Sequence, residues 1–249
     1  IPQESAILRH AGYAILRSPA VTAAVRFGMH GGGHGHPDKL NIVTFGLGKL
    51  GGMDPGSIHY GVPLHREWYR TTVAHNTVAV DEQDQAPVDG TLELWDVSGA
   101  SVRFQAVVDG AYPGVSLRRR LELKASQLQD RFECESDQVH TYDWAFHVPG
   151  KFQATDEWAP ATGALGSDNG YQHIRLQYRR TLASDWKASW DLGGAVLELE
   201  WQGEPATEVY VGEAPGRDPS TPISVLVVRR KAKRTVFETI HRFLPGANR

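Results

Sequence analysis

The chain has 249 residues, of which 41% are hydrophobic and 22% charged, and its formal net charge at pH 7 is -3. This composition excludes an intrinsically disordered or fibrous protein, and the charge excludes the basic field typical of nucleic-acid-binding proteins. No apolar run approaches the ~18 residues of a membrane span, so we expect neither a nucleic-acid partner nor a membrane partner.

Segments in which apolar and polar residues alternate recur along the chain and predict β-strands with one buried and one solvated face. Other runs are apolar on both faces, as in central strands. In chain order the candidate strands are 42–45, 92–97, 115–123, 174–179, 196–201, 225–228 and 235–240, of which the first and the last two are apolar on both faces. No stretch of about 12 residues shows a helical period with caps. The sequence predicts an all-β protein, a large two-layer antiparallel β-sandwich, in a single domain over residues 1–249.

The only cysteine, Cys134, lies in an alternating segment, so we expect a buried thiol and no internal disulfide. The first residues, from Ile1 onward, include no initiator Met and no apolar leader. We therefore expect a processed product or a piece of a longer protein.

Residues 28–85 carry most of the chemical information, because six of the eleven histidines fall there. His36 precedes the predicted strand 42–45, Asp54 follows it, and His75 precedes the next apolar run. Antiparallel neighbours would bring such strand ends together. Two imidazoles and one carboxylate are ligands that zinc accepts, and the same set also suits a non-haem iron centre.

Each of these residues also has a purely structural interpretation. Asp54-Pro55-Gly56 is good turn chemistry, Trp68 and Tyr69 suit a core, and Lys39 suits a solvated charge. Four other histidines are expected at the surface, namely His10, His140, His173 and His241. Two basic runs are typical of solvated strand faces, with contact to anionic sugars as the alternative; they are Arg118 to Arg120 and Arg229 to Lys231 with Lys233 and Arg234.

Three motifs together resemble the heparinase II/III-like family of polysaccharide lyases, whose members act on heparin, heparan sulfate and alginate. The motifs run from His34 to Asn41 (HGHPDKLN), from Asp54 to Gly56 (DPG) and from Trp68 to Val78 (WYRTTVAHNTV). The tail 236–241 also resembles the closing strand of that family. The likeness extends broadly over the chain and is sharp over residues 28–85.

The resemblance implies a β-sandwich, which agrees with the strand pattern, and a zinc ion held by His36, Asp54 and His75. It also implies that His34 faces the substrate cleft together with a tyrosine, for which Tyr60 is the first candidate and Tyr69 the second. Family enzymes place a helical α/α toroid before the sandwich. This chain resembles only the C-terminal half, so we expect an N-terminal helical domain of the same protein as a partner.

The activity implied is β-elimination on an acidic polysaccharide or oligosaccharide containing uronic acid, with a periplasmic or secreted location. Tyrosine and histidine suit the acid and base roles, and the metal would tie the cleft segments together. A non-catalytic module that binds acidic glycans is the alternative, and a 2-His-1-carboxylate oxygenase is a further one. Self-association into a homo-oligomer stays open.

Overall fold

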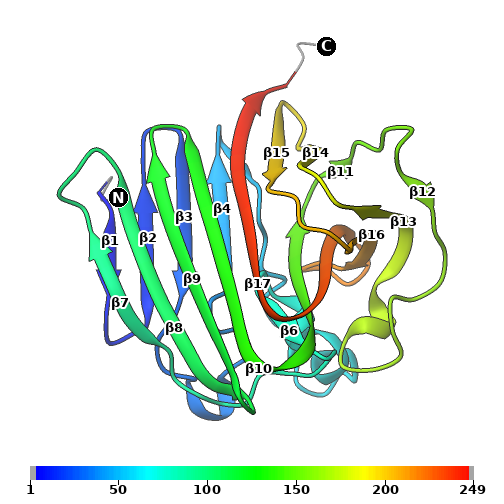
Figure 1. Ribbon diagram of the computed structural model, residues 1–249, viewed down its shortest axis with the longest axis horizontal. Coiled ribbons are helices and arrows are strands. Elements are labelled where there is room, and N and C mark those ends of the chain that lie inside the picture. The colour runs from blue at the N-terminus through cyan, green and yellow to red at the C-terminus, as the bar shows by residue number, and fades with distance from the viewer. Residues whose placement is uncertain (1–3, 247–249) are drawn as a thin grey trace.

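The computed structural model describes residues 4–246 and is built almost entirely of antiparallel strands (Figure 1). A smaller sheet carries, in order, β1 (Ala6–Leu8), β2 (Tyr13–Arg17), β3 (Val21–Arg26), β4 (Ile42–Gly46) and β5 (Lys49–Leu50). The main path of the larger sheet runs β11 (Lys151–Phe152), β14 (Trp186–Asp191), β15 (Ala195–Trp201), β17 (Pro222–Pro245), β10 (Gln127–Val148), β9 (Val115–Lys124), β8 (Val102–Tyr112) and β7 (Thr91–Asp96). Off this path, β6 (Val78–Val80) pairs with β10, and β16 (Thr207–Pro215), β13 (Arg175–Leu182) and β12 (Ala159–Pro160) continue from β17.

The two sheets form the predicted β-sandwich. In Figure 1 the blue strands β2 and β3 lie behind the green strands β8 and β9. Alternation along the strands supplies the core between the layers, to which β3 contributes Val25 and the larger sheet contributes residues such as Phe104 and Phe132, all fully buried. Burying each such side chain stabilises the fold by about 1.5–3 kcal/mol. The all-β prediction is confirmed, and each predicted strand segment overlaps a strand of the structure.

Strand β17 is longer than the pattern predicted, because the runs 225–228 and 235–240 belong to this one strand. Its first part pairs with β16 and its last part with β15, while β10 pairs with it on the other edge over nearly its whole length. An irregularity between Glu135 and His140 interrupts the β10–β17 register. Such bulges bend a sheet, and the part of β10 beyond this one pairs with β6, which follows the histidine-rich segment.

Helical segments are short and cluster near the histidine-rich region: η1 (Gly32–His34), η2 (His65–Tyr69), η3 (Thr72–Ala74) and η4 (Tyr171–His173). Within residues 4–246, none of them has the length and apolar character needed to cross a membrane. The single-domain boundary stays a prediction.

Cys134 is buried as predicted, and this burial raises the pKa of its thiol. Other expectations from the sequence were wrong. Lys39, Arg119 and His241 are buried, with at most 1% of each residue exposed, and Arg230 is only 3% exposed. Arg119 shares the inward face of β9 with Leu117 and Leu121, and its charge is compensated by a two-point ion pair with the buried Asp130.

Candidate functional site

Two stretches of little regular structure bring the predicted site residues together; we call residues 28–41 and 51–77 the site loops. The first stretch carries His34 and His36 and leads into β4. The second lies between β5 and β6 and carries Asp54 near its start and His75 near its end. Since β6 pairs with β10, the second site loop is anchored on the larger sheet, while the His30 N–H of the first donates to Asp89, just before β7, at 2.8 Å.

Asn76 is the residue that joins these segments. Its backbone N–H donates to Asn41 Oδ1 at 2.9 Å, and its side-chain Nδ2 donates to the carbonyls of Ile42 and Met53 at 2.7 and 3.1 Å. Its Oδ1 accepts from the backbone N–H of His147 at 2.7 Å and lies 3.0 Å from His147 Nδ1. One fully buried amide thereby fixes both site loops against β10.

The three predicted metal ligands are neighbours in the structure. His75 Nδ1 lies 2.8 Å from Asp54 Oδ2, and the rings of His36 and His75 are 5.3 Å apart between centroids. Asp54 also accepts a hydrogen bond from Asn41 Nδ2 at 2.6 Å and from the Gly56 N–H at 2.7 Å, so the predicted turn is present as well. The arrangement is a polar cluster in which every Asp54 oxygen has a donor.

The electrostatics of this cluster follow from burial and from the ion pair. Burial alone would raise the pKa of Asp54, but the charge of His75 and the hydrogen bond with it hold that pKa below its ordinary value. Burial opposes protonation of His75, while the charge of Asp54 raises its pKa. Burial, followed by the charge of His75, lowers the pKa of His36 to about 4. His36 is therefore a neutral imidazole at pH 7, which is the form that binds a metal.

The residues fit a zinc ion by type and by neighbourhood. Two imidazoles and a carboxylate form the donor set, and the Nε2 atom of His75 is buried with no hydrogen-bond partner. Yet within residues 4–246 no three histidine, cysteine or acidic side chains converge closely enough to hold an ion as they stand. Asp54 and His75 are hydrogen-bonded to each other instead, so the metal remains a prediction.

His34 and Tyr60 meet at the surface of the site loops. His34 Nδ1 lies 2.9 Å from the Tyr60 hydroxyl, and 62% of Tyr60 is exposed. The Tyr60 ring also rests edge-on against His65, with centroids 4.6 Å apart. An exposed tyrosine whose hydroxyl contacts an imidazole is an arrangement that can accept and return a proton.

Tyr69, the second tyrosine candidate, does not face the surface. It is fully buried, and its hydroxyl donates to the Gly216 carbonyl at 2.6 Å. Burial raises the pKa of this hydroxyl above its ordinary value. Tyr69 packs in a second apolar cluster with Trp68, as the structural interpretation of these two aromatic residues predicted.

Three site residues escaped the sequence analysis: His65, Arg70 and His147. Both ring nitrogens of His65 are buried without a partner, and His65 begins η2, a single turn of π-helix of the kind frequent at functional sites. His147 is fully buried near the end of β10, and burial, followed by the charge of His75, lowers its pKa to about 3. For His147 the signal was a histidine in an otherwise apolar strand end, whereas nothing local distinguished His65 or Arg70.

The basic runs do not form a free cationic strip. Arg118 pairs with Glu93 at 2.9 Å, Arg229 with Asp143 at 2.7 Å, and Arg230 with Glu204 at 2.8 Å. These contacts give the arginines a structural role on the strands, although Arg119 and Arg230 are buried and not solvated as predicted. They leave few free positive charges there for an acidic glycan.

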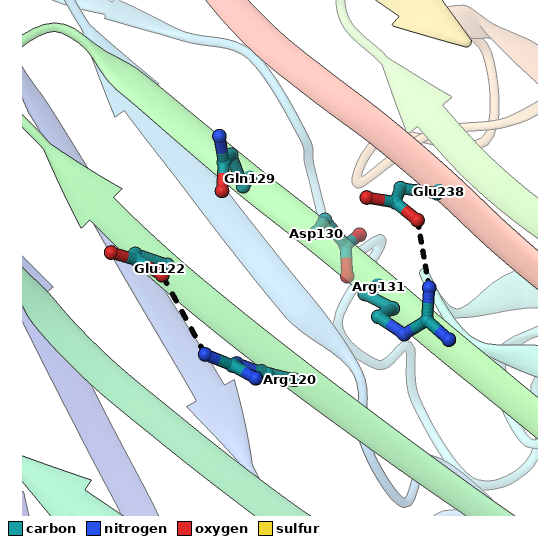
Figure 2. A pocket seen from close by; sticks show the side chains of 6 residues that line it. All are labelled: Arg120, Glu122, Gln129, Asp130, Arg131 and Glu238. Atoms are coloured by element: carbon teal, nitrogen blue, oxygen red, sulfur yellow. Dashed lines mark hydrogen bonds and ion pairs between the residues drawn. The ribbon is translucent and has the colours of Figure 1, made fainter. Parts of the chain in front are cut away.

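A hollow of about 220 Å³ lies on the outer face of β9, β10 and β17 (Figure 2). At its border Arg120 pairs with Glu122 along β9 at 3.7 Å, and Arg131 of β10 pairs with Glu238 of β17 at 2.8 Å. Its charges are thus already matched, and none of its lining residues belongs to the site loops.

Comparisons with known proteins agree with the fold. The model of the family described as heparinase II/III-like, C-terminal, matches residues 1–221. An alginate lyase of Stenotrophomonas maltophilia is 29% identical over 222 residues, covering 77% of this chain and 30% of that protein. An exo-oligoalginate lyase of Saccharophagus degradans is 25% identical over 247 residues, covering 84% and 33%.

Among solved structures, the heparan sulfate lyase HepC of Pedobacter heparinus superimposes with a TM-score of 0.73 at 14% identity, covering 99% of this chain and 37% of that one. A galactose mutarotase-like protein of Lactobacillus casei shares the fold with a TM-score of 0.53 at 9% identity. The chain spans about a third of the length of the two curated relatives that it matches.

Proposed function

The chain belongs to the heparinase II/III-like family, matching its C-terminal domain, and from this premise we propose that it forms the sandwich part of a polysaccharide lyase that cleaves uronic-acid glycans by β-elimination. The contact of 2.9 Å between His34 Nδ1 and the exposed Tyr60 hydroxyl is the observation that carries the proposal. The family match favours a lyase over the oxygenase alternative. Alginate is the first polymer to assay, because both matching relatives are alginate lyases by name.

The proposed reaction breaks the C5–H bond of a uronate and the C4–O4 bond, and it forms a C4–C5 double bond. A base must take the C5 proton, and an acid must supply a proton to the departing O4. We assign the proton transfers on this chain to the Tyr60 oxygen, with His34 exchanging a proton with it. Because Tyr60 is an exposed residue, a sugar ring can approach it without rearrangement of the sandwich.

We also propose that His36, Asp54 and His75 hold a zinc ion, supported by their types and their proximity. Zinc supplies fixed coordination, which here would tie the segment of His36 to the second site loop and keep His34 and Tyr60 in register. A His36→Ala variant should lose the metal, as measured by mass spectrometry of the purified protein, and unfold at lower temperature. Unchanged metal content would remove His36 from the ligand set.

A helical domain preceding this chain is part of the proposal, as is a periplasmic or secreted location. The additional domain is supported by the fact that this chain covers only about a third of each of the two relatives. Acid and base groups from such a domain would face Tyr60 across the cleft. We therefore expect little turnover from this chain alone.

The test is an assay of the longer protein on alginate, glucuronan, heparan sulfate and ulvan, followed through the ultraviolet absorbance of the unsaturated product. Tyr60→Phe and His34→Ala should each lower turnover by about 100-fold or more, because each removes a proton-transfer group. Tyr178→Phe is the matched control, since Tyr178 belongs to β13, outside the site loops, and its ring packs against Phe152. Absence of unsaturated product from all four polymers would contradict the proposal.

A further inference from the structure

Arg70 is a cation without an acidic partner beside the proposed catalytic pair. It follows η2 directly, is half-buried, and donates from Nη2 to the Gly35 carbonyl at 2.9 Å. Gly35 separates His34 from His36, so the guanidinium lies against the loop that carries both. Within residues 4–246 no carboxylate lies within ion-pair distance of Arg70, and none of its nitrogens is both buried and unpartnered. Its remaining N–H groups therefore face solvent.

The other two cations near this loop are already compensated. Arg26 Nε lies 3.1 Å from Asp38 Oδ1, and Lys39 Nζ lies 3.9 Å from the same oxygen. Arg26 also donates to the His30 carbonyl at 2.8 Å, which makes it a structural counterpart of Arg70 on the opposite end of the loop. Of these three charges, only that of Arg70 lacks a counter-charge in the described chain.

The surroundings hold Arg70 in place. A side chain at position 35 would place its Cβ 2.1 Å from the His30 carbonyl oxygen, so only glycine lets the loop pack this closely and present its own carbonyl to Arg70. The charge of Arg70 also affects the pKa of a neighbouring histidine. After burial, the charge of Arg70 is the next cause of the lowered pKa of His65, the residue on which Tyr60 rests.

We infer that Arg70 binds a carboxylate of the glycan, on a sugar unit next to the one that reacts at Tyr60. The inference rests on the proposed function, because it takes the substrate to be a uronate chain lying across His34 and Tyr60. A guanidinium offers planar paired donors that match a carboxylate, and partial burial strengthens such a pair. A half-buried cation with free donors at the rim of the site is thus explained by the charge of the ligand.

The test measures the binding of two tetrasaccharides to the longer protein at equilibrium. One is a mannuronate tetramer, and the other is the same tetramer with its carboxylates methyl-esterified. A Tyr60→Phe background slows cleavage of the ligand during the measurement. Arg70→Gln should raise the Kd of the acidic tetramer about 10- to 100-fold, since it removes a charge-assisted hydrogen-bond pair, and should leave the Kd of the ester unchanged. The Kd of the acidic tetramer for Arg70→Lys should lie between the values for the parent and for Arg70→Gln.

Arg66→Gln is the matched control, because Arg66 is exposed on the same helix η2 and carries the same charge. Its acidic-tetramer Kd should stay close to that of the parent. Equal losses for the acidic and the esterified tetramer in Arg70→Gln would overturn the inference, since they would indicate that Arg70 only shapes the loop. An unchanged acidic-tetramer Kd would overturn it as well. Arg70-dependent binding in a protein that forms no unsaturated product would sustain this inference while contradicting the lyase.

Discussion

The sandwich and the site loops are stabilised by different means. In the sandwich, alternating strands bury large apolar side chains such as Phe104 and Phe132, which pack within one large core cluster. The site loops contain little regular structure. Part of the second packs in the smaller apolar cluster around Trp68, and the two loops are tied together by a few buried polar groups, above all Asn76 and Arg119. Apolar packing tolerates substitution of similar volume, whereas a buried polar network fails when one partner is lost. The site should therefore be more sensitive than the fold to single changes.

Arg119 links the two regions, so its loss should have the largest effect. From β9 it pairs with Asp130 and donates from Nη1 to the carbonyls of Leu40 and Asn76, both at 2.6 Å. Arg119→Ala removes the arginine partner of a buried carboxylate and should lower the free energy of unfolding by about 3–5 kcal/mol. Urea unfolding measures this effect. Arg118→Ala, one position away and partly exposed, should cost less than about 1 kcal/mol, and equal losses in the two variants would contradict this account.

Asn76→Ala should affect the site loops before the sandwich. It leaves several buried donors and acceptors unpaired and should cost about 2–3 kcal/mol. Hydrogen exchange followed by mass spectrometry should show faster exchange in residues 28–41 and 51–77, while β8 and β9 stay protected. Uniform loss of protection would show that the two regions unfold as one unit.

His147 should make the region beneath the site loops sensitive to acid. Its pKa is about 3 in the folded chain and the ordinary value is 6.5, so between these values the unfolded chain binds the extra proton. Stability therefore falls as the pH is lowered from 6.5, by about 2 kcal/mol for this one group between pH 7 and pH 5.

His147→Gln should remove that part of the pH dependence, as measured by urea unfolding at the two pH values in the presence of a chelator. His36, whose pKa is also low, remains in both proteins, so the difference isolates His147. Identical losses between pH 7 and pH 5 in variant and parent would rule out this origin.

The smallest effect is expected on the outer face of the sandwich. Arg131 borders the hollow of Figure 2 and pairs with Glu133 and Glu238, at a side-chain exposure of 41%. Arg131→Ala should change the free energy of unfolding by less than about 1 kcal/mol, and salt should diminish that change. A loss as large as that of Arg119→Ala would remove the distinction between exposed and buried charge on these neighbouring strands.

The sandwich was predictable because its strands obey period two almost everywhere. The same rule, applied strictly, would have identified Arg119, since positions 117, 119 and 121 of β9 share one face. A run of three arginines suggested solvated charges, and the buried partner Asp130 lies on another strand, where no local pattern signals it.

The candidate site was predictable to a lesser degree. His36, Asp54 and His75 are neighbours, as their positions at strand ends indicated, and His34 meets Tyr60. His147 reaches the site from 71 residues beyond Asn76, and the importance of Arg70 lies in the carboxylate that it lacks. Neither long-range contact nor an absent counter-charge leaves a mark in a short stretch of sequence.

The position of β17 has a consequence for biosynthesis. The hairpin of β14 and β15 and the pair of β13 and β16 join β10 only through β17, which comes after all of them in the chain. While the polypeptide emerges from the ribosome, the edge of β10 that pairs with β17 stays unpaired until β17 has been synthesised. Nascent chains with open strand edges are prone to aggregate, so this protein should depend on chaperones until β17 has been translated.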